Sequence, residues 1–184
     1  MNRLKLFSIP FTSLKNGKHS FDFKIEDSFF VDFEYSPIKK ACIQVDLEFN
    51  KQETMFVLDF VLNGEVELTC DRCNEEFRSP FHTNERLIFK FGEESEVETE
   101  EIIILSRAEH EINLANHLYE FIVVGIPLIH VHTDKEDGSS GCNPETIEIL
   151  NKLSISGNET TEKEEGPEAI IDPRWEALKK LRDN

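Results

Sequence analysis

Residues 41–70, ACIQVDLEFNKQETMFVLDFVLNGEVELTC, decide the fold class of this 184-residue chain. Apolar side chains alternate with mostly polar ones along the stretch, at Ile43, Val45, Leu47, Phe49, then Phe56, Leu58, Phe60, Leu62, then Val66, Leu68 and Cys70. A period of two buries one face of a β-sheet and leaves the other in solvent. The pair Asn63-Gly64 is typical of a two-residue hairpin turn, so it predicts a turn between two of these runs.

The same alternation continues on both sides of this stretch, at Phe21, Phe23, Ile25 and at Leu87, Phe89, Phe91. It predicts an antiparallel sheet that curls on itself, with phenylalanines filling the inside. From about residue 109 the period changes, and Leu114, Leu118, Phe121 and Ile122 form one helical stripe. We expect this helix to cover an open part of the sheet. The predicted class is α+β: a curved antiparallel sheet or a small partly closed β-barrel, covered by a few helices, with mobile acidic loops.

The domain organisation follows from the same change of pattern. Residues 1–132 are expected to form a β-rich globular core with one amphipathic helix. Residues 133–184 are expected to be a loop-rich C-terminal extension of the same domain, with short helices starting at Pro144 and at Asp172-Pro173. Residues 93–101 hold six acidic residues, and a low-complexity acidic stretch covers residues 154–168.

Charge and hydropathy exclude several classes of protein. The net charge is −17, and backbone binding to nucleic acid depends on lysines and arginines, so the chain is not a generally basic RNA coat. Much of the acidic excess is local, with −6 in residues 93–101 and −4 in residues 159–168. The N-terminus does not resemble a signal peptide, and the longest apolar run, 121–129, is too short to span a bilayer. We therefore expect a cytoplasmic protein with reduced or metal-bound cysteines.

The segment Cys70-Asp71-Arg72-Cys73 carries the clearest chemical signal. Two cysteines at this spacing form a redox dithiol at a helix N-terminus, or half of a tetrahedral zinc site on a turn between strands. A strand precedes the motif and no helical pattern follows it, which favours the metal. The candidate zinc ligands are Cys70, Cys73, Cys142 and His132, with His130 as the alternative imidazole. Cys42, at the start of a strand, is expected to be a small packed residue.

Other motifs give no catalytic site. No glycine-rich phosphate loop is present, and the acidic clusters fall in loops where carboxylates titrate normally. Basic residues near the thiol turn, namely Arg72, Arg78, Arg86 and Lys90, offer a small patch that can face phosphate.

The order of these parts resembles the YceD-like family, the large ribosomal RNA subunit accumulation proteins. The resemblance rests on Gly64-x-Val66-x-Leu68-x-Cys70-x-Arg72-Cys73-x3-Phe77, on the apolar helix between Ile112-Asn113-Leu114 and Ile126-Pro127-Leu128, and on Asp172-Pro173-Arg174-Trp175-x2-Leu178-x2-Leu181. It implies a bacterial cytosolic protein that is needed for normal levels of 23S ribosomal RNA, with a role in ribosome assembly and no known catalytic activity. Many relatives carry a further cysteine pair near the C-terminus, where this chain has only Cys142.

The first hypothesis is therefore a non-enzymatic ribosome-biogenesis factor that associates with an assembly intermediate through a basic ribosomal protein or assembly factor. Its candidate partner or RNA contacts are Arg72, Arg78, Arg174 and Trp175, and direct RNA contact is left open. Two alternatives stand beside it: a structural zinc-binding interaction module of another role, and a Cys-x-x-Cys dithiol oxidoreductase.

Overall fold

The computed structural model describes residues 3–92, 102–135 and 138–153. The acidic segment 93–101 and the predicted helix at Asp172-Pro173 lie outside these ranges. The chain divides into two compact units, Met1–Glu148 and Ile149–Asn184, and all of the described sheet belongs to the first. The grouping of 1–132 with 133–184 in one domain stays a prediction.

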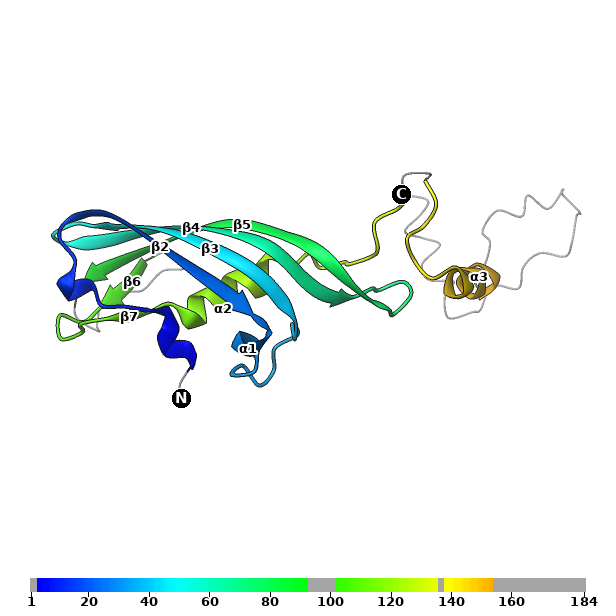
Figure 1. The fold of residues 1–184 in the computed structure, drawn as a ribbon, viewed down its shortest axis with the longest axis horizontal. Coiled ribbons are helices and arrows are strands. Elements are labelled where there is room, and N and C mark those ends of the chain that lie inside the picture. The colour runs from blue at the N-terminus through cyan, green and yellow to red at the C-terminus, as the bar shows by residue number, and fades with distance from the viewer. Residues whose placement is uncertain (1–2, 93–101, 136–137, 154–184) are drawn as a thin grey trace, which may run out of the picture. The chain divides into compact units, whose positions relative to one another are not determined.

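A five-stranded sheet forms the body of the first unit (Figure 1). Its order is β2 (Gly17–Glu26), β3 (Ala41–Lys51), β4 (Met55–Thr69), β5 (Glu76–Phe91) and β6 (Ile102–Leu105). The first four strands are antiparallel, whereas β6 runs parallel to β5, with Ile88 opposite Ile102. The α+β class is confirmed, and no closed barrel is found among the described strands.

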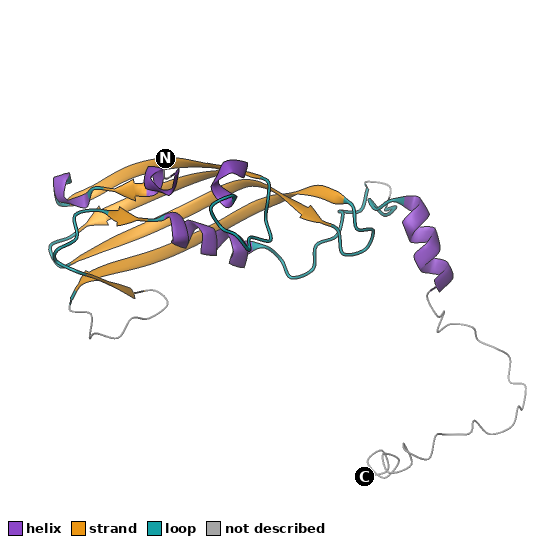
Figure 2. Cartoon of the chain, turned by 90° about the horizontal axis from the view of Figure 1, so that it is seen from below, coloured by secondary structure: helices purple, strands orange, loops and turns teal. Residues whose placement is uncertain are grey.

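Alternation places the core on one face of this sheet. Along β3, every second side chain is buried from Ala41 to Phe49, and the strand β4 beside it buries Phe56, Leu58, Phe60 and Leu62. Figure 2 shows the helices α1 (Asp27–Phe30) and α2 (Ala115–Gly125) against one side of the sheet. The N-terminal segment covers the same side with two 3-10 turns (Arg3–Phe7 and Phe11–Ser13) and with β1 (Ser8–Ile9), which pairs with β7 (Ile112–Asn113).

The predicted hairpin turn at Asn63-Gly64 is wrong, because both residues lie inside β4. Gly64 pairs with Ile43 on β3 and with Phe81 on β5, so the ladder continues through it on both sides. A Cβ atom at Gly64 would lie 2.1 Å from the Cys42 carbonyl oxygen. The glycine is therefore needed for the close approach of β3, not for a turn. The hairpin connections are residues 52–54 and 70–75 instead.

The predicted helix in residues 114–125 is confirmed as α2. It buries Ala115, Leu118 and Ile122 against the sheet, and the Asn113 side chain accepts a hydrogen bond from the Ala115 backbone (2.9 Å). Gly125 ends the helix where a Cβ atom would lie 2.8 Å from the Phe81 ring. A further helix, α3 (Pro144–Leu153), begins at the predicted proline. None of the helices in the described ranges is long and apolar enough to cross a membrane.

Candidate metal centre

The Cys-x-x-Cys motif forms the turn between β4 and β5. The Glu75 carbonyl accepts a hydrogen bond from the Cys70 backbone (2.9 Å), and the Cys70 carbonyl accepts one from the Asn74 backbone (2.8 Å). Asn74 has φ 59°, a left-handed conformation that asparagine tolerates better than most residues. The turn therefore presents Cys70 and Cys73 together at one end of the longest hairpin.

A later segment of the chain, residues 130–143, returns to this turn; we call it the return arm. Asp71 donates its backbone N–H to the His130 carbonyl (2.8 Å), and its carboxylate accepts the His130 N–H (2.8 Å). Within the arm, a Cβ atom at Gly141 would lie 2.2 Å from the Thr133 carbonyl oxygen, so only glycine fits this bend. The bend brings Cys142 beside the hairpin turn.

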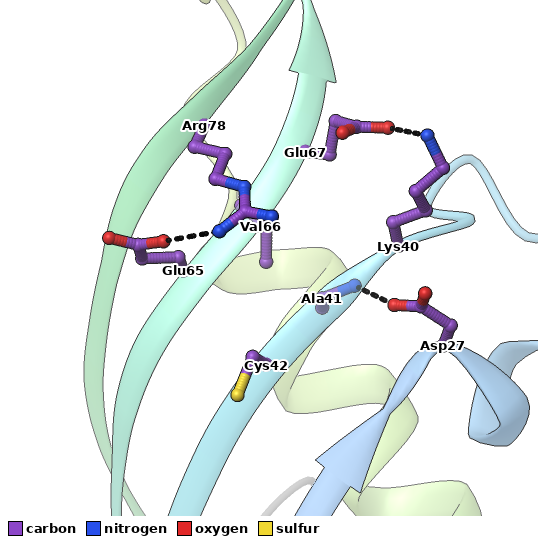
Figure 3. Close-up of a pocket in the computed structure, with 8 residues that line it drawn as sticks. All are labelled: Asp27, Lys40, Ala41, Cys42, Glu65, Val66, Glu67 and Arg78. Atoms are coloured by element: carbon purple, nitrogen blue, oxygen red, sulfur yellow. Dashed lines mark hydrogen bonds and ion pairs between the residues drawn. The ribbon is translucent and has the colours of Figure 1, made fainter.

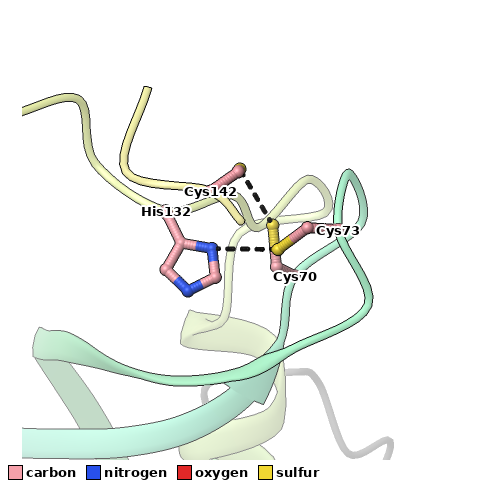
Figure 4. A group of neighbouring side chains, drawn as sticks. All are labelled: Cys70, Cys73, His132 and Cys142. Atoms are coloured by element: carbon pink, nitrogen blue, oxygen red, sulfur yellow. Dashed lines mark hydrogen bonds between the residues drawn. The ribbon is translucent and has the colours of Figure 1, made fainter. Parts of the chain in front are cut away.

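Three sulfurs and one imidazole converge where the arm meets the turn (Figure 4). Cys70 Sγ lies 3.7 Å from Cys142 Sγ, and Cys73 Sγ lies 3.4 Å from His132 Nδ1. The four ligand atoms all lie within 4.8 Å of one another. Bond lengths of zinc to thiolate and imidazole give tetrahedral edges of about 3.8 Å for S···S and about 3.5 Å for S···N. The residues present therefore fit a closed four-coordinate metal site.

The structure separates the two candidate histidines. His132 faces Cys73, and its ring packs on Phe77 with centroids 4.6 Å apart. His130 instead donates Nδ1–H to the Thr69 carbonyl (2.9 Å) and lies 3.3 Å from the Asp71 carboxylate. It braces the arm against the turn, and the described cluster does not include it. Asp71 and Gly141 were not predicted from the sequence, because only the folded arm gives them a role.

The electrostatics of the cluster favour one thiolate. Burial raises the pKa of Cys70, but hydrogen bonds from the backbone at Cys73, Arg72 and His132 lower it, with a net pKa of about 5. The Ser140 hydroxyl lowers the pKa of Cys142, but burial and the neighbouring Cys70 and Cys73 thiols outweigh it and raise that pKa. One ionised sulfur beside two further thiols is a suitable set of donors for a soft divalent cation.

The geometry disfavours a dithiol oxidoreductase. A lowered thiol pKa is expected of such enzymes, and Cys70 meets that condition. However, Cys70 and Cys73 are only 1% and 7% exposed, and they lie on a β-turn and not at a helix N-terminus. A substrate disulfide would have to reach sulfurs that are already in contact with His132 and Cys142.

The predicted basic contacts do not form one patch. Arg86 and Lys90 lie eight and twelve residues beyond Arg78 along β5, or about 27 and 41 Å at strand spacing. Arg78 pairs with Glu65 (3.6 Å), and Arg72 donates to the Ser140 hydroxyl (3.5 Å). Arg174 and Trp175 lie outside the described residues.

Cys42 occupies a shallow hollow of about 90 Å³ on the outer face of the sheet (Figure 3). The prediction that it is packed is wrong: Ala41 and Ile43 take the inner face, which leaves Cys42 exposed. The charged groups of the hollow are already engaged, since Lys40 pairs with Glu67 (2.6 Å) and Asp27 accepts a hydrogen bond from the Ala41 backbone (3.0 Å). The hollow therefore offers a ligand little unpaired charge.

Comparison with known proteins gives one match. The family model described as "Large ribosomal RNA subunit accumulation protein YceD" matches residues 58–182. This range contains most of β4, all of β5 and α2, and the four residues of the cluster. No curated protein and no solved structure matches the chain.

Proposed function

Because the chain belongs to the YceD family, we propose that it supports the accumulation of large-subunit (23S) ribosomal RNA as a non-enzymatic factor of ribosome biogenesis in the cytoplasm. The observation that carries this proposal is the family match, which spans about two thirds of the chain and includes the hairpin, α2 and the return arm. The family description names an RNA-accumulation role and no reaction.

Deletion of the gene in its own host tests this role. We expect the ratio of large-subunit to small-subunit ribosomal RNA to fall, and immature large-subunit particles to accumulate in sucrose gradients. Wild-type protein expressed from a plasmid should restore the ratio. An unchanged ratio in the deletion strain, with normal particles, would overturn the proposal.

We propose that the chain reaches the assembling subunit through a basic protein. Its charge of −17 repels phosphate and attracts basic partners. On the outer face of the sheet, several cations are already paired with carboxylates: Lys18 with Glu48 (2.7 Å), Lys40 with Glu67 (2.6 Å), Lys24 with Glu26 (2.7 Å) and Arg86 with Asp59. A phosphate would have to compete with these partners.

Crosslinking in cells, followed by purification under denaturing conditions, distinguishes the two kinds of partner. We expect peptides of a ribosomal protein or basic assembly factor to be attached to the chain. Binding that falls as salt rises is expected, because steering by opposite charge is screened. Crosslinks to large-subunit RNA alone, with none to protein, would overturn this part of the proposal.

We further propose that Cys70, Cys73, Cys142 and His132 hold a structural zinc ion. Zinc has no redox chemistry of its own, and a closed site with four protein ligands leaves no position for a substrate. Its contribution is to fasten the return arm to the hairpin turn. Metal analysis of protein purified under reducing conditions should find one zinc ion per chain, and the absence of stoichiometric metal would overturn this assignment.

A further inference from the structure

Three cysteine sulfurs meet in the candidate metal centre, and they come from distant parts of the chain. Cys70 and Cys73 belong to the hairpin turn, whereas Cys142 follows Cys70 by 72 residues. The Cys70 and Cys142 sulfurs are 3.7 Å apart, and Figure 4 shows them pointing toward each other. A disulfide bond is about 2.05 Å long, so the two sulfurs must approach by roughly 1.7 Å, which small side-chain rotations can supply.

The imidazole decides which two thiols are best placed to join. His132 Nδ1 lies 3.4 Å from Cys73 Sγ, so Cys73 is the thiol that the ring engages. A bond between Cys70 and Cys73 would form inside a turn whose backbone is held by hydrogen bonds of the Cys70 N–H and carbonyl. The pair Cys70 and Cys142 has no such constraint, because the arm that carries Cys142 lies outside the turn.

We propose that the metal centre is a redox switch, in which hydrogen peroxide joins Cys70 to Cys142 and releases the metal. This inference rests on the proposed zinc site. Peroxide first converts one thiol to a sulfenic acid: its O–O bond breaks and one oxygen leaves as water. The second thiol then attacks the sulfenic sulfur, the S–O bond breaks, and a second water leaves as the disulfide forms. The two thiols lose two electrons and two protons in total, peroxide becomes two waters, and zinc leaves as Zn²⁺.

Release of the metal follows from the number of ligands that remain. After the disulfide forms, only Cys73 and His132 are left, and a structural zinc site needs four ligands. The arm then stays attached to the turn at Cys142 but loses its attachment at His132. Oxidation therefore changes how residues 130–141 are held without separating the arm from the sheet.

Burial sets the response of the switch to oxidant. Cys70 and Cys142 are 1% and 4% exposed, so peroxide reaches them only when the arm opens. Cys42 is exposed on the outer face of the sheet and is expected to react first, without loss of metal. The Cys42→Ser chain removes this competing reaction and is the background for the test.

The experiment uses the zinc-loaded, full-length Cys42→Ser protein treated with hydrogen peroxide. Metal release is followed with a chromophoric chelator, free thiols are counted in parallel, and disulfides are mapped by mass spectrometry of peptides. We expect zinc release and the loss of two of three thiols to share one time course, with a Cys70–Cys142 bond as the product. A thiol reductant and added zinc should restore the starting state.

Two results separate this inference from the zinc assignment. If the protein holds no zinc before peroxide is added, both fail. If zinc is present but is released with a Cys70–Cys73 bond, or with sulfinic or sulfonic acids and no disulfide, only the switch fails. The Cys73→Ser variant gives a second measurement: it should still form the Cys70–Cys142 bond under peroxide, and loss of that bond would overturn the proposal.

Discussion

Replacing His132 by alanine is expected to weaken zinc binding by about two orders of magnitude, whereas replacing His130 should leave it nearly unchanged. Both histidines lie on the return arm, two residues apart. Only His132 directs a ring nitrogen at the thiols, 3.4 Å from Cys73 Sγ. His130 Nδ1 is engaged by the Thr69 carbonyl at 2.9 Å.

The magnitude follows from the number of ligands. Structural zinc sites bind with apparent free energies of about 10–16 kcal/mol, so one ligand of four contributes about 3 kcal/mol, or roughly 150-fold in the dissociation constant. His130→Ala removes one hydrogen bond to a backbone carbonyl, worth about 1 kcal/mol, and should change zinc affinity by less than about fivefold.

Competition against a chromophoric chelator of known affinity measures both variants at one pH, with Cys42→Ser as a control for loss of an exposed thiol outside the cluster. Circular dichroism of each variant checks that the sheet is intact. Equal weakening by His130→Ala and His132→Ala would refute the assignment of the ligand. So would wild-type affinity in the His132→Ala chain.

Three further perturbations test the fold and the thiol chemistry. Leu118→Ala should lower the free energy of unfolding in urea by about 2–5 kcal/mol, because Leu118 is fully buried between α2 and the sheet, while Val124→Ala on the exposed side of α2 should change it by less than about 0.5 kcal/mol. Gly64→Ala should cost about 1–3 kcal/mol, since its Cβ meets a β3 carbonyl oxygen at 2.1 Å; Val61→Ala on the same strand is the control, and equal stability of the two would contradict the close approach. In the metal-free chain, the pKa of Cys70 falls from 9.0 to about 5, so its contribution to stability is fully present above pH 9.0 and is lost as pH falls toward about 5. Thiolate ultraviolet absorbance of the folded chain should therefore persist at pH 7, and its absence there would contradict the lowered pKa.

Alternation alone was enough to predict the core face of the sheet and the stripe of α2. Each depends on local periodicity, which survives in the folded chain because a slip by one residue would expose every buried side chain of β3. Neither the pairing of β1 with β7 nor the parallel direction of β6 could be predicted, since strands of two to four residues carry too little pattern.

The failed hairpin shows how the same periodicity should have been applied. In a two-residue turn at 63–64, Leu62 would face Glu65, and the acidic side chains of Glu65 and Glu67 would point into the core. The apolar positions instead stay in phase through Gly64 to Val66, as one continuous strand requires. The phase also places Cys42 outward once Ile43 is inward, so both errors came from ranking a dipeptide or a residue type above the alternation.

The candidate site was predicted as a set of residue types, but not its geometry. The sequence offered two histidines near Cys142, and nothing in their spacing distinguished them. The distinction depends on the Asp71–His130 backbone pair, which turns one ring toward Thr69 and leaves the other facing the thiols. Such contacts join residues about sixty positions apart and leave no local signal.

The contacts between the return arm and the turn are few for a segment of this length. Cys70, Cys73 and Cys142 form a small buried cluster of their own, separate from the main core. Beyond it, the arm is held by hydrogen bonds such as Asn143 to Glu75 (2.7 Å), each worth about 1 kcal/mol. Ordering each residue costs about 1–2 kcal/mol, so these bonds do not suffice, whereas a structural zinc ion contributes on the order of 10 kcal/mol.

Removal of the metal should therefore release the arm and leave the sheet folded. Limited trypsin digestion of the full chain with and without a chelator tests this, because Lys135 lies exposed within the arm. We expect cleavage after Lys135 to accelerate at least about tenfold on chelation, corresponding to a loss of about 1.4 kcal/mol of local protection. The spectrum of the β-sheet should stay unchanged, since the main core does not include the cysteines. Equal cleavage rates in both states would show that protein contacts alone hold the arm.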